Sequence, residues 1–125
     1  MIYVHTVAVL SILQFIAFGI LVGVARGKHG VKAPAMTGSE AFERAVRVHA
    51  NTLEQLVCFL PALFLAAAYW SPVFVSITGV VYLVGRLVFR QAYVADPSKR
   101  GPGFLLTLVP TLVLLVAALL GAVLA

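Results

Sequence analysis

Two groups of polar side chains in this sequence repeat with the spacing of a single helix face. They are Arg47, Asn51 and Glu54 in the first group, and Arg86, Arg90 and Tyr93 in the second. Each group stands at positions i, i+4 and i+7, which share one face of an α-helix. Guanidinium groups bind carboxylates with paired hydrogen bonds, and a carboxylate accepts hydrogen bonds from an ammonium group. The pattern therefore predicts two helices that hold a charged ligand between them.

The two stripes and one nearby arginine carry more positive charge than they can neutralise. Four arginines face Glu54 as the only acid at similar depth in the apolar sequence: Arg47, Arg86, Arg90 and Arg100. Such an excess in a semi-enclosed site favours an anionic ligand, with a carboxylate held in bidentate fashion. Glu54 is then left for a ligand ammonium group. A ligand that satisfies both the arginines and Glu54 is a zwitterion with more carboxylate than ammonium groups. The alternative is that Glu54 pairs with Arg86 or Arg47 and that the cluster only joins the helices.

The composition decides which solvent surrounds these helices. Of 125 residues, 62% are hydrophobic and 10% are charged, and the mean hydropathy is +1.08. Soluble domains are about 45–50% apolar and about 25% charged, so this chain has too few polar residues to cover a soluble core. We expect an all-α integral membrane protein. The net charge of +5 does not indicate nucleic acid, because the basic residues flank hydrophobic segments and no nucleic-acid-binding motif is present.

Four segments are long and apolar enough to cross a bilayer, which needs about 20 residues. We predict helices at about residues 2–25, 41–70, 73–95 and 103–125 of one four-helix transmembrane domain spanning 1–125. Ser39 is the expected N-cap of the second helix, and Asp96-Pro97-Ser98 is expected to end the third. Pro61 and Pro110 should kink their helices without breaking them.

All formal side-chain charge falls in or near the loop between the first two helices or the loop between the last two. With four spans, these two loops lie on one side of the membrane. Because basic residues mark the cytoplasmic side, we expect both loops to be cytoplasmic and both termini to be outside. A charge at depth costs about 2.5–3.5 kcal/mol on insertion scales, so the deep arginines need partners or a ligand.

Three segments resemble the MAPEG family, the membrane-associated proteins in eicosanoid and glutathione metabolism. They are FERAVRVHANTLE (42–54), GRLVFRQAY (85–93) and DPSKRGPG (96–103). The resemblance covers nearly the whole chain and is greatest to the microsomal glutathione transferase branch. It implies a homotrimer of four-helix subunits in the lipid bilayer, with glutathione sites between neighbouring subunits near the cytoplasmic face.

The resemblance also implies which residues act. Arg100 stands where the family places the arginine that stabilises the glutathione thiolate. The expected glutathione-binding residues are Arg26, Arg47, His49, Asn51, Glu54, Arg86, Arg90 and Tyr93. His49 lies about 160° around the helix from the Arg47–Asn51 stripe, so it should face another helix or a neighbouring subunit. Glutathione is the expected co-substrate, and no metal is expected.

The activity that follows is a glutathione S-transferase, with possible peroxidase activity, acting on hydrophobic electrophiles or lipid hydroperoxides. The alternative is a non-catalytic lipid-binding or structural membrane protein of the same fold. The chain departs from the family pattern at Gln55, where several members have an aromatic residue, and at Phe89, where some present a tyrosine hydroxyl. Its helix proline, Pro61, lies one turn later than in those relatives. The sequence does not name the electrophile.

Overall fold

A computed structural model describes all residues 1–125 and consists of four long helices joined by short connections. The helices are α1 (Ile2–Lys28), α2 (Glu40–Ala67), α3 (Pro72–Ala95) and α4 (Gly101–Leu124), with a 3₁₀ turn, η1, at Pro97–Lys99. All four are long and apolar enough to cross a membrane. The predicted all-α, four-helix membrane bundle is therefore confirmed.

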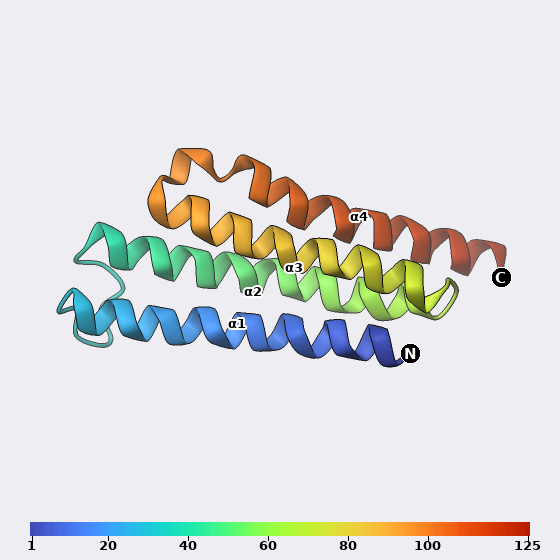
Figure 1. The fold of residues 1–125 in the computed structure, drawn as a ribbon, viewed down its shortest axis with the longest axis horizontal. Helices are drawn as coiled ribbons and strands as arrows, with labels where there is room; N and C mark the ends of the chain where they lie inside the picture. Colours follow the sequence, from blue (N-terminus) through green and yellow to red (C-terminus); the bar gives the residue numbers. More distant parts are fainter.

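The helices run side by side along their length, so the connections gather at two ends (Figure 1). The loop between α1 and α2 and the turn between α3 and α4 lie at one end, called here the charged end. Both termini and the short α2–α3 connection lie at the other, called here the terminal end. The predicted gathering of the two charged loops on one side is thus present.

Capping residues explain where several helices begin and end. Several of these ends differ from the predicted ranges. Ser39 caps α2 as predicted, since its hydroxyl accepts a hydrogen bond from the N–H of Phe42. Asp96 ends α3 as predicted. The predicted end of the first helix at residue 25 was wrong, because α1 continues to Lys28, and α2 stops at Ala67 instead of reaching residue 70. Gly30, with φ of +68°, provides the left-handed turn after α1.

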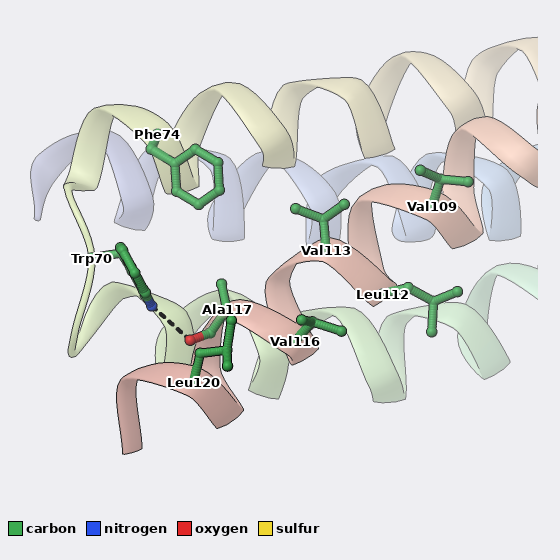
Figure 2. Close-up of a pocket in the computed structure, with 8 residues that line it drawn as sticks. All are labelled: Trp70, Phe74, Val109, Leu112, Val113, Val116, Ala117 and Leu120. Atoms are coloured by element: carbon green, nitrogen blue, oxygen red, sulfur yellow. Dashed lines mark hydrogen bonds between the residues drawn. The ribbon is translucent and has the colours of Figure 1, made fainter. Parts of the chain in front are cut away.

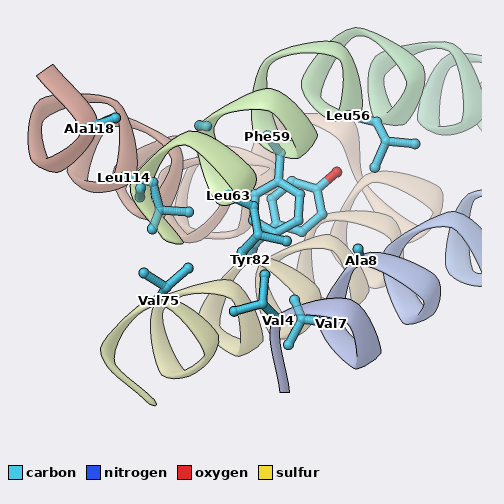
Figure 3. Packing of buried hydrophobic residues seen from close by; sticks show 12 residues of the cluster. Val4, Val7, Ala8, Leu56, Phe59, Leu63, Val75, Tyr82, Leu114 and Ala118 are labelled. Atoms are coloured by element: carbon cyan, nitrogen blue, oxygen red, sulfur yellow. The ribbon is translucent and has the colours of Figure 1, made fainter. Parts of the chain in front are cut away.

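Apolar side chains fill the bundle towards the terminal end (Figure 3). Phe59 of α2 and Tyr82 of α3 stack in its centre, with ring centroids 3.8 Å apart and planes 7° from parallel. In lipid, burial of apolar surface gives little gain between helices, so close packing holds them together. Side-chain hydrogen bonds add to it, as where Gln14 of α1 donates to the carbonyl oxygen of Leu83, 2.9 Å away.

Two glycines let α3 and α4 approach to backbone contact at the charged end. A Cβ atom on Gly85 would lie 2.6 Å from the carbonyl carbon of Leu106. A Cβ atom on Gly103 would overlap the backbone of Phe89. Since these contacts are with backbone and cannot be relieved by a side-chain rotation, α3 and α4 can pack this closely only with glycine at both places.

We predict that Gly85→Ala lowers the thermal unfolding midpoint in detergent. The steric cost of overpacking, about 1–3 kcal/mol, should exceed the gain in helix propensity of about 1 kcal/mol. Gly23→Ala in α1 is the matched control, because nothing lies within 4 Å of its Cβ position, and it should keep or raise the midpoint. Equal shifts in both variants would contradict the close α3–α4 contact.

Candidate functional site

A polar pocket opens at the charged end between α2, α3 and α4. Its volume is about 520 Å³, within the range of roughly 300–1,000 Å³ that is usual for small-molecule sites. Each helix contributes two residues, and the lining consists of Arg47, Asn51, Phe89, Tyr93, Arg100 and Phe104. Four of these belong to the site predicted from the sequence. Positive charge and aromatic rings therefore meet in one cavity.

The helical spacing brings the α2 residues to this pocket. Arg47 and Asn51 lie one turn apart on the lining face. The guanidinium of Arg47 is exposed and forms no hydrogen bond or ion pair within the chain. Glu54, one turn further on, is also exposed, and the amide nitrogen of Asn51 lies 3.5 Å from its carboxylate oxygen. Arg47 thus has its full hydrogen-bonding capacity available for an anionic ligand.

The turn between α3 and α4 places Arg100 at the pocket. Asp96 organises this turn, since its Oδ1 accepts hydrogen bonds from the backbone N–H of Ser98 at 3.1 Å and the hydroxyl of Ser98 at 2.8 Å. Arg100 is the N-cap of α4, and its Nη1 donates to the carbonyl oxygen of Pro97 at 3.0 Å. These hydrogen bonds from Ser98, first that of its side chain and then that of its backbone, hold the pKa of the Asp96 carboxyl below its ordinary value of 3.8.

Arg44 fixes the same turn from the side of α2. Its Nη1 donates to the carbonyl oxygens of Val94 and Ala95, each at 3.2 Å. These are among the last carbonyls of α3, which have no partner within the helix and carry partial negative charge. Arg44 also forms the one ion pair of the chain, with Glu40 at 3.7 Å. The start of α2 and the end of α3 are thereby joined beside Arg100.

Arg86 lies inside the bundle and does not line the pocket. Its side chain is fully buried, with an exposed fraction of 0%. Nη1 donates to Asn51 Oδ1 at 2.8 Å and to Thr52 Oγ1 at 3.2 Å, and Nε donates to Thr107 Oγ1 at 2.9 Å. The guanidinium also lies over the ring of Phe89, 4.3 Å from its centroid. The alternative in which Glu54 pairs with Arg86 or Arg47 is wrong, since neither ion pair forms.

Five residues of the predicted site do not line the pocket of their own chain: Arg86 and Glu54, described above, and His49, Arg90 and Arg26. His49 stacks on Phe15 of α1, with centroids 4.5 Å apart, as expected for a residue on the other side of α2. The guanidinium of Arg90 lies 5.5 Å from the ring of Phe18, also on α1. Arg26 lies over the ring of Phe42 and donates to the carbonyl oxygen of Ala35 at 2.7 Å.

The sequence interpretation missed the contributions of α4 other than Arg100. Phe104 lines the pocket, and Thr107 accepts a hydrogen bond from Arg86. Both follow Arg100 at i+4 and i+7, the same spacing that revealed the α2 and α3 stripes. Thr52 was missed because a threonine beside Asn51 on an apolar helix has no distinctive pattern.

Two further grooves follow the seam between α3 and α4 and hold no charged side chain. One is wholly apolar and lies at the terminal end (Figure 2), where the indole N–H of Trp70 donates to the carbonyl oxygen of Ala117 at 2.6 Å. The other lies between Ile77 and Pro102 and is lined mainly by aliphatic residues. Neither can neutralise an anion. A further pocket at the charged end contains Arg26 and Lys32, but only the pocket between α2, α3 and α4 combines two arginines with an amide and a tyrosine, which makes it the candidate site.

Comparison with known proteins decides the family. The family model for MAPEG matches residues 4–120. This chain belongs to the MAPEG family. An uncharacterized protein of Synechocystis is 44% identical over 114 residues, covering 91% of this chain and 83% of that protein.

Two named relatives in this family are enzymes by their names. Human microsomal glutathione S-transferase 2 is 39% identical over 102 residues, covering 82% of this chain and 69% of its own length. Leukotriene C4 synthase of Cavia porcellus is 34% identical over 95 residues, covering 76% of this chain and 63% of its own length. The MAPEG match spans all four helices and all residues of the pocket.

We predict that Asp96→Ala lowers the thermal unfolding midpoint of this MAPEG chain at neutral pH and that the difference shrinks in acid. The folded-state pKa of Asp96 is depressed, so its stabilising contribution is complete above the unfolded value and is lost as the pH falls through the lower, folded value. Asp96→Asn, which keeps one acceptor oxygen, should fall between the two proteins. A difference that stays constant below pH 3.8 would contradict the role of the ionised carboxylate.

Proposed function

We propose that this chain is a membrane-bound glutathione S-transferase that also reduces hydroperoxides, with glutathione as co-substrate. Support comes from the family and from the names of its relatives, which include microsomal glutathione S-transferase 2. The single observation that carries the proposal is the pocket in which Arg47, Asn51, Tyr93 and Arg100 meet. The guanidinium of Arg47, which has no partner within the chain, fits a carboxylate of the peptide glutathione, and the guanidinium of Arg100 adds a second positive charge to the pocket.

Arg47, Asn51 and Tyr93 hold the peptide in this proposal, and Glu54 accepts hydrogen bonds from its ammonium group. Glu54 is suited to that role because it has no cationic partner in the chain. Arg100 stays protonated and donates hydrogen bonds without acting as a base. As a fixed positive charge it favours the thiolate of glutathione over the thiol, and the N-terminal end of α4 favours negative charge at the same place.

The thiolate is the nucleophile in both reactions. In conjugation, a new bond forms between the sulfur and the electrophilic carbon, and a leaving group departs or the neighbouring atom takes a proton. In peroxide reduction, the sulfur takes one oxygen, the O–O bond breaks and an alcohol leaves. A second glutathione then reduces the sulfenic acid and gives the disulfide and water.

We further propose that the site is completed in a homotrimer. Arg26 of α1 lies over Phe42 of α2, and His49 stacks on Phe15 of α1; neither lines the pocket of its own chain. In an assembly with α1 and α2 of one protomer beside the pocket of the next, they contribute to the neighbouring site. Arg90 is oriented towards α1 in the same way. Hydrophobic electrophiles reach the thiolate from the lipid between protomers.

The proposed orientation puts the charged end on the cytoplasmic side and both termini outside. It is supported by the absence of charged side chains at the terminal end and by the preference of Lys and Arg for the cytoplasmic side. Glutathione then enters from the cytoplasm, on the same side as Arg100.

We predict that Arg100→Ser lowers the turnover of a small aromatic electrophile about a hundredfold, in line with the loss of one charge-stabilising donor. Glutathione affinity should stay within a few-fold, and the thiolate absorbance of bound glutathione should vanish. Arg100→Lys, which keeps the charge, should retain part of both signals. Full turnover in Arg100→Ser would remove Arg100 from the mechanism, whereas a parent protein without turnover would favour a non-catalytic, lipid-binding protein.

We predict that Arg47→Ala and Glu54→Ala each weaken glutathione binding about tenfold or more, the cost of losing a charged hydrogen bond. Titration calorimetry on the detergent-solubilised protein measures this. Lys28→Ala removes a charge at the end of α1 that does not line the pocket, and it should leave affinity unchanged. If both variants bind as the parent does, Arg47 and Glu54 do not hold the ligand.

A further inference from the structure

The fully buried Arg86 lies behind the pocket and not in its lining, unlike an arginine that binds a ligand directly. It is enclosed by the bundle and absent from the pocket lining, yet it contacts two residues that do line the pocket. These are Asn51, by a hydrogen bond of 2.8 Å, and Phe89, by the stacking of its ring on the guanidinium. Arg86 is therefore placed directly behind the residues that face the ligand.

Two of the three hydrogen-bond partners of Arg86 are threonine hydroxyls that donate their own protons to backbone carbonyls. Thr52 donates its hydroxyl proton to the carbonyl oxygen of Val48 at 2.7 Å, and Thr107 donates to that of Gly103 at 3.0 Å. Each hydroxyl oxygen is thus left to accept from Arg86. This arrangement fixes the guanidinium between α2 and α4 without a carboxylate.

The same chemistry decides which way the amide of Asn51 is turned. Arginine can only donate hydrogen bonds, so the Asn51 atom facing it must be the oxygen. The amide nitrogen then lies on the other side, where it approaches the Glu54 carboxylate at 3.5 Å and borders the pocket. Asn51 therefore presents hydrogen-bond donors to a ligand and no acceptor.

We propose that Arg86 is a positioning residue that acts through Asn51: by holding the amide oxygen, it directs the N–H groups of Asn51 at an acceptor oxygen of glutathione. This inference rests on the proposed function for its ligand. It assigns Arg86 no contact with glutathione, in contrast to the direct binding role expected from the family resemblance. It also makes Thr107, in the middle of an apolar helix, part of the support of the site.

A double-mutant cycle in glutathione affinity tests the proposal. Arg86→Met and Asn51→Ala should each weaken binding about tenfold, the usual cost of an interaction with a charged or ligand-bound group. Because Arg86 acts through Asn51, the double variant should bind no more weakly than Asn51→Ala alone. A double variant weaker by the product of the two single effects would mean that Arg86 contacts the ligand itself, which overturns the proposal.

Asn51→Asp gives a second readout that a purely structural role would not produce. An aspartate would neutralise the buried Arg86, so the thermal midpoint should rise. It would also replace the donors by a negative charge, so glutathione affinity should fall at least about tenfold. A variant that is more stable and binds equally well would overturn the directed-donor role of Asn51.

A matched pair on α4 keeps the test decisive if Arg86→Met does not fold. Thr107→Val removes the acceptor for Arg86 Nε, and Thr111→Val removes a buried hydroxyl one turn away that bonds only to the carbonyl of Thr107. Affinity should fall several-fold in the first and stay unchanged in the second, whereas equal affinities would overturn the proposal.

A parent that binds no glutathione would overturn the proposed function itself. If the parent binds glutathione normally but the effects of Arg86→Met and Asn51→Ala multiply in the double variant, only this inference is overturned.

Discussion

The buried guanidinium of Arg86 is the constraint around which the charged end of the bundle is built. A full positive charge at this depth cannot be left without partners, and the chain provides hydroxyl and amide oxygens from α2 and α4 but no acid. Arg86 therefore connects three helices at one level. Any displacement of α4 relative to α2 would break at least one of the hydrogen bonds of Nε and Nη1, so these bonds fix the spacing of the two helices at this level, while Nη2 is buried without a partner.

The terminal end and the charged end of the bundle are held together by different interactions. Towards the terminal end, packed apolar side chains such as Phe59 and Tyr82 hold the helices together without polar contacts of their own. At the charged end, glycine contacts bring α3 and α4 together, and Arg44 and Asp96 order the turn that carries Arg100. The pocket can thus keep free charge on Arg47 because other residues supply the structural contacts.

The sequence was sufficient for the helices and for four of the six residues that line the polar pocket, for a definite physical reason. Hydrophobic length and charge placement decide how a chain crosses a bilayer, and helical spacing puts Arg47 and Asn51 on one face. Spacing along one helix cannot tell how far a residue lies from the neighbouring helix. Arg86 and Tyr93 share a stripe in the sequence, but only Tyr93 lines the pocket. The backbone contacts of Gly85 and Gly103, which determine that depth, leave no periodic pattern to detect.

In the proposed function, the positive charge of this pocket, above all the unpartnered guanidinium of Arg47, recognises the carboxylates of glutathione. The most direct measurement is a calorimetric comparison of glutathione with its diethyl ester, which keeps the thiol and the ammonium group but has no carboxylate. We expect saturable binding of glutathione by the detergent-solubilised protein and little or no binding of the diester. Equal affinity for the two compounds would contradict it.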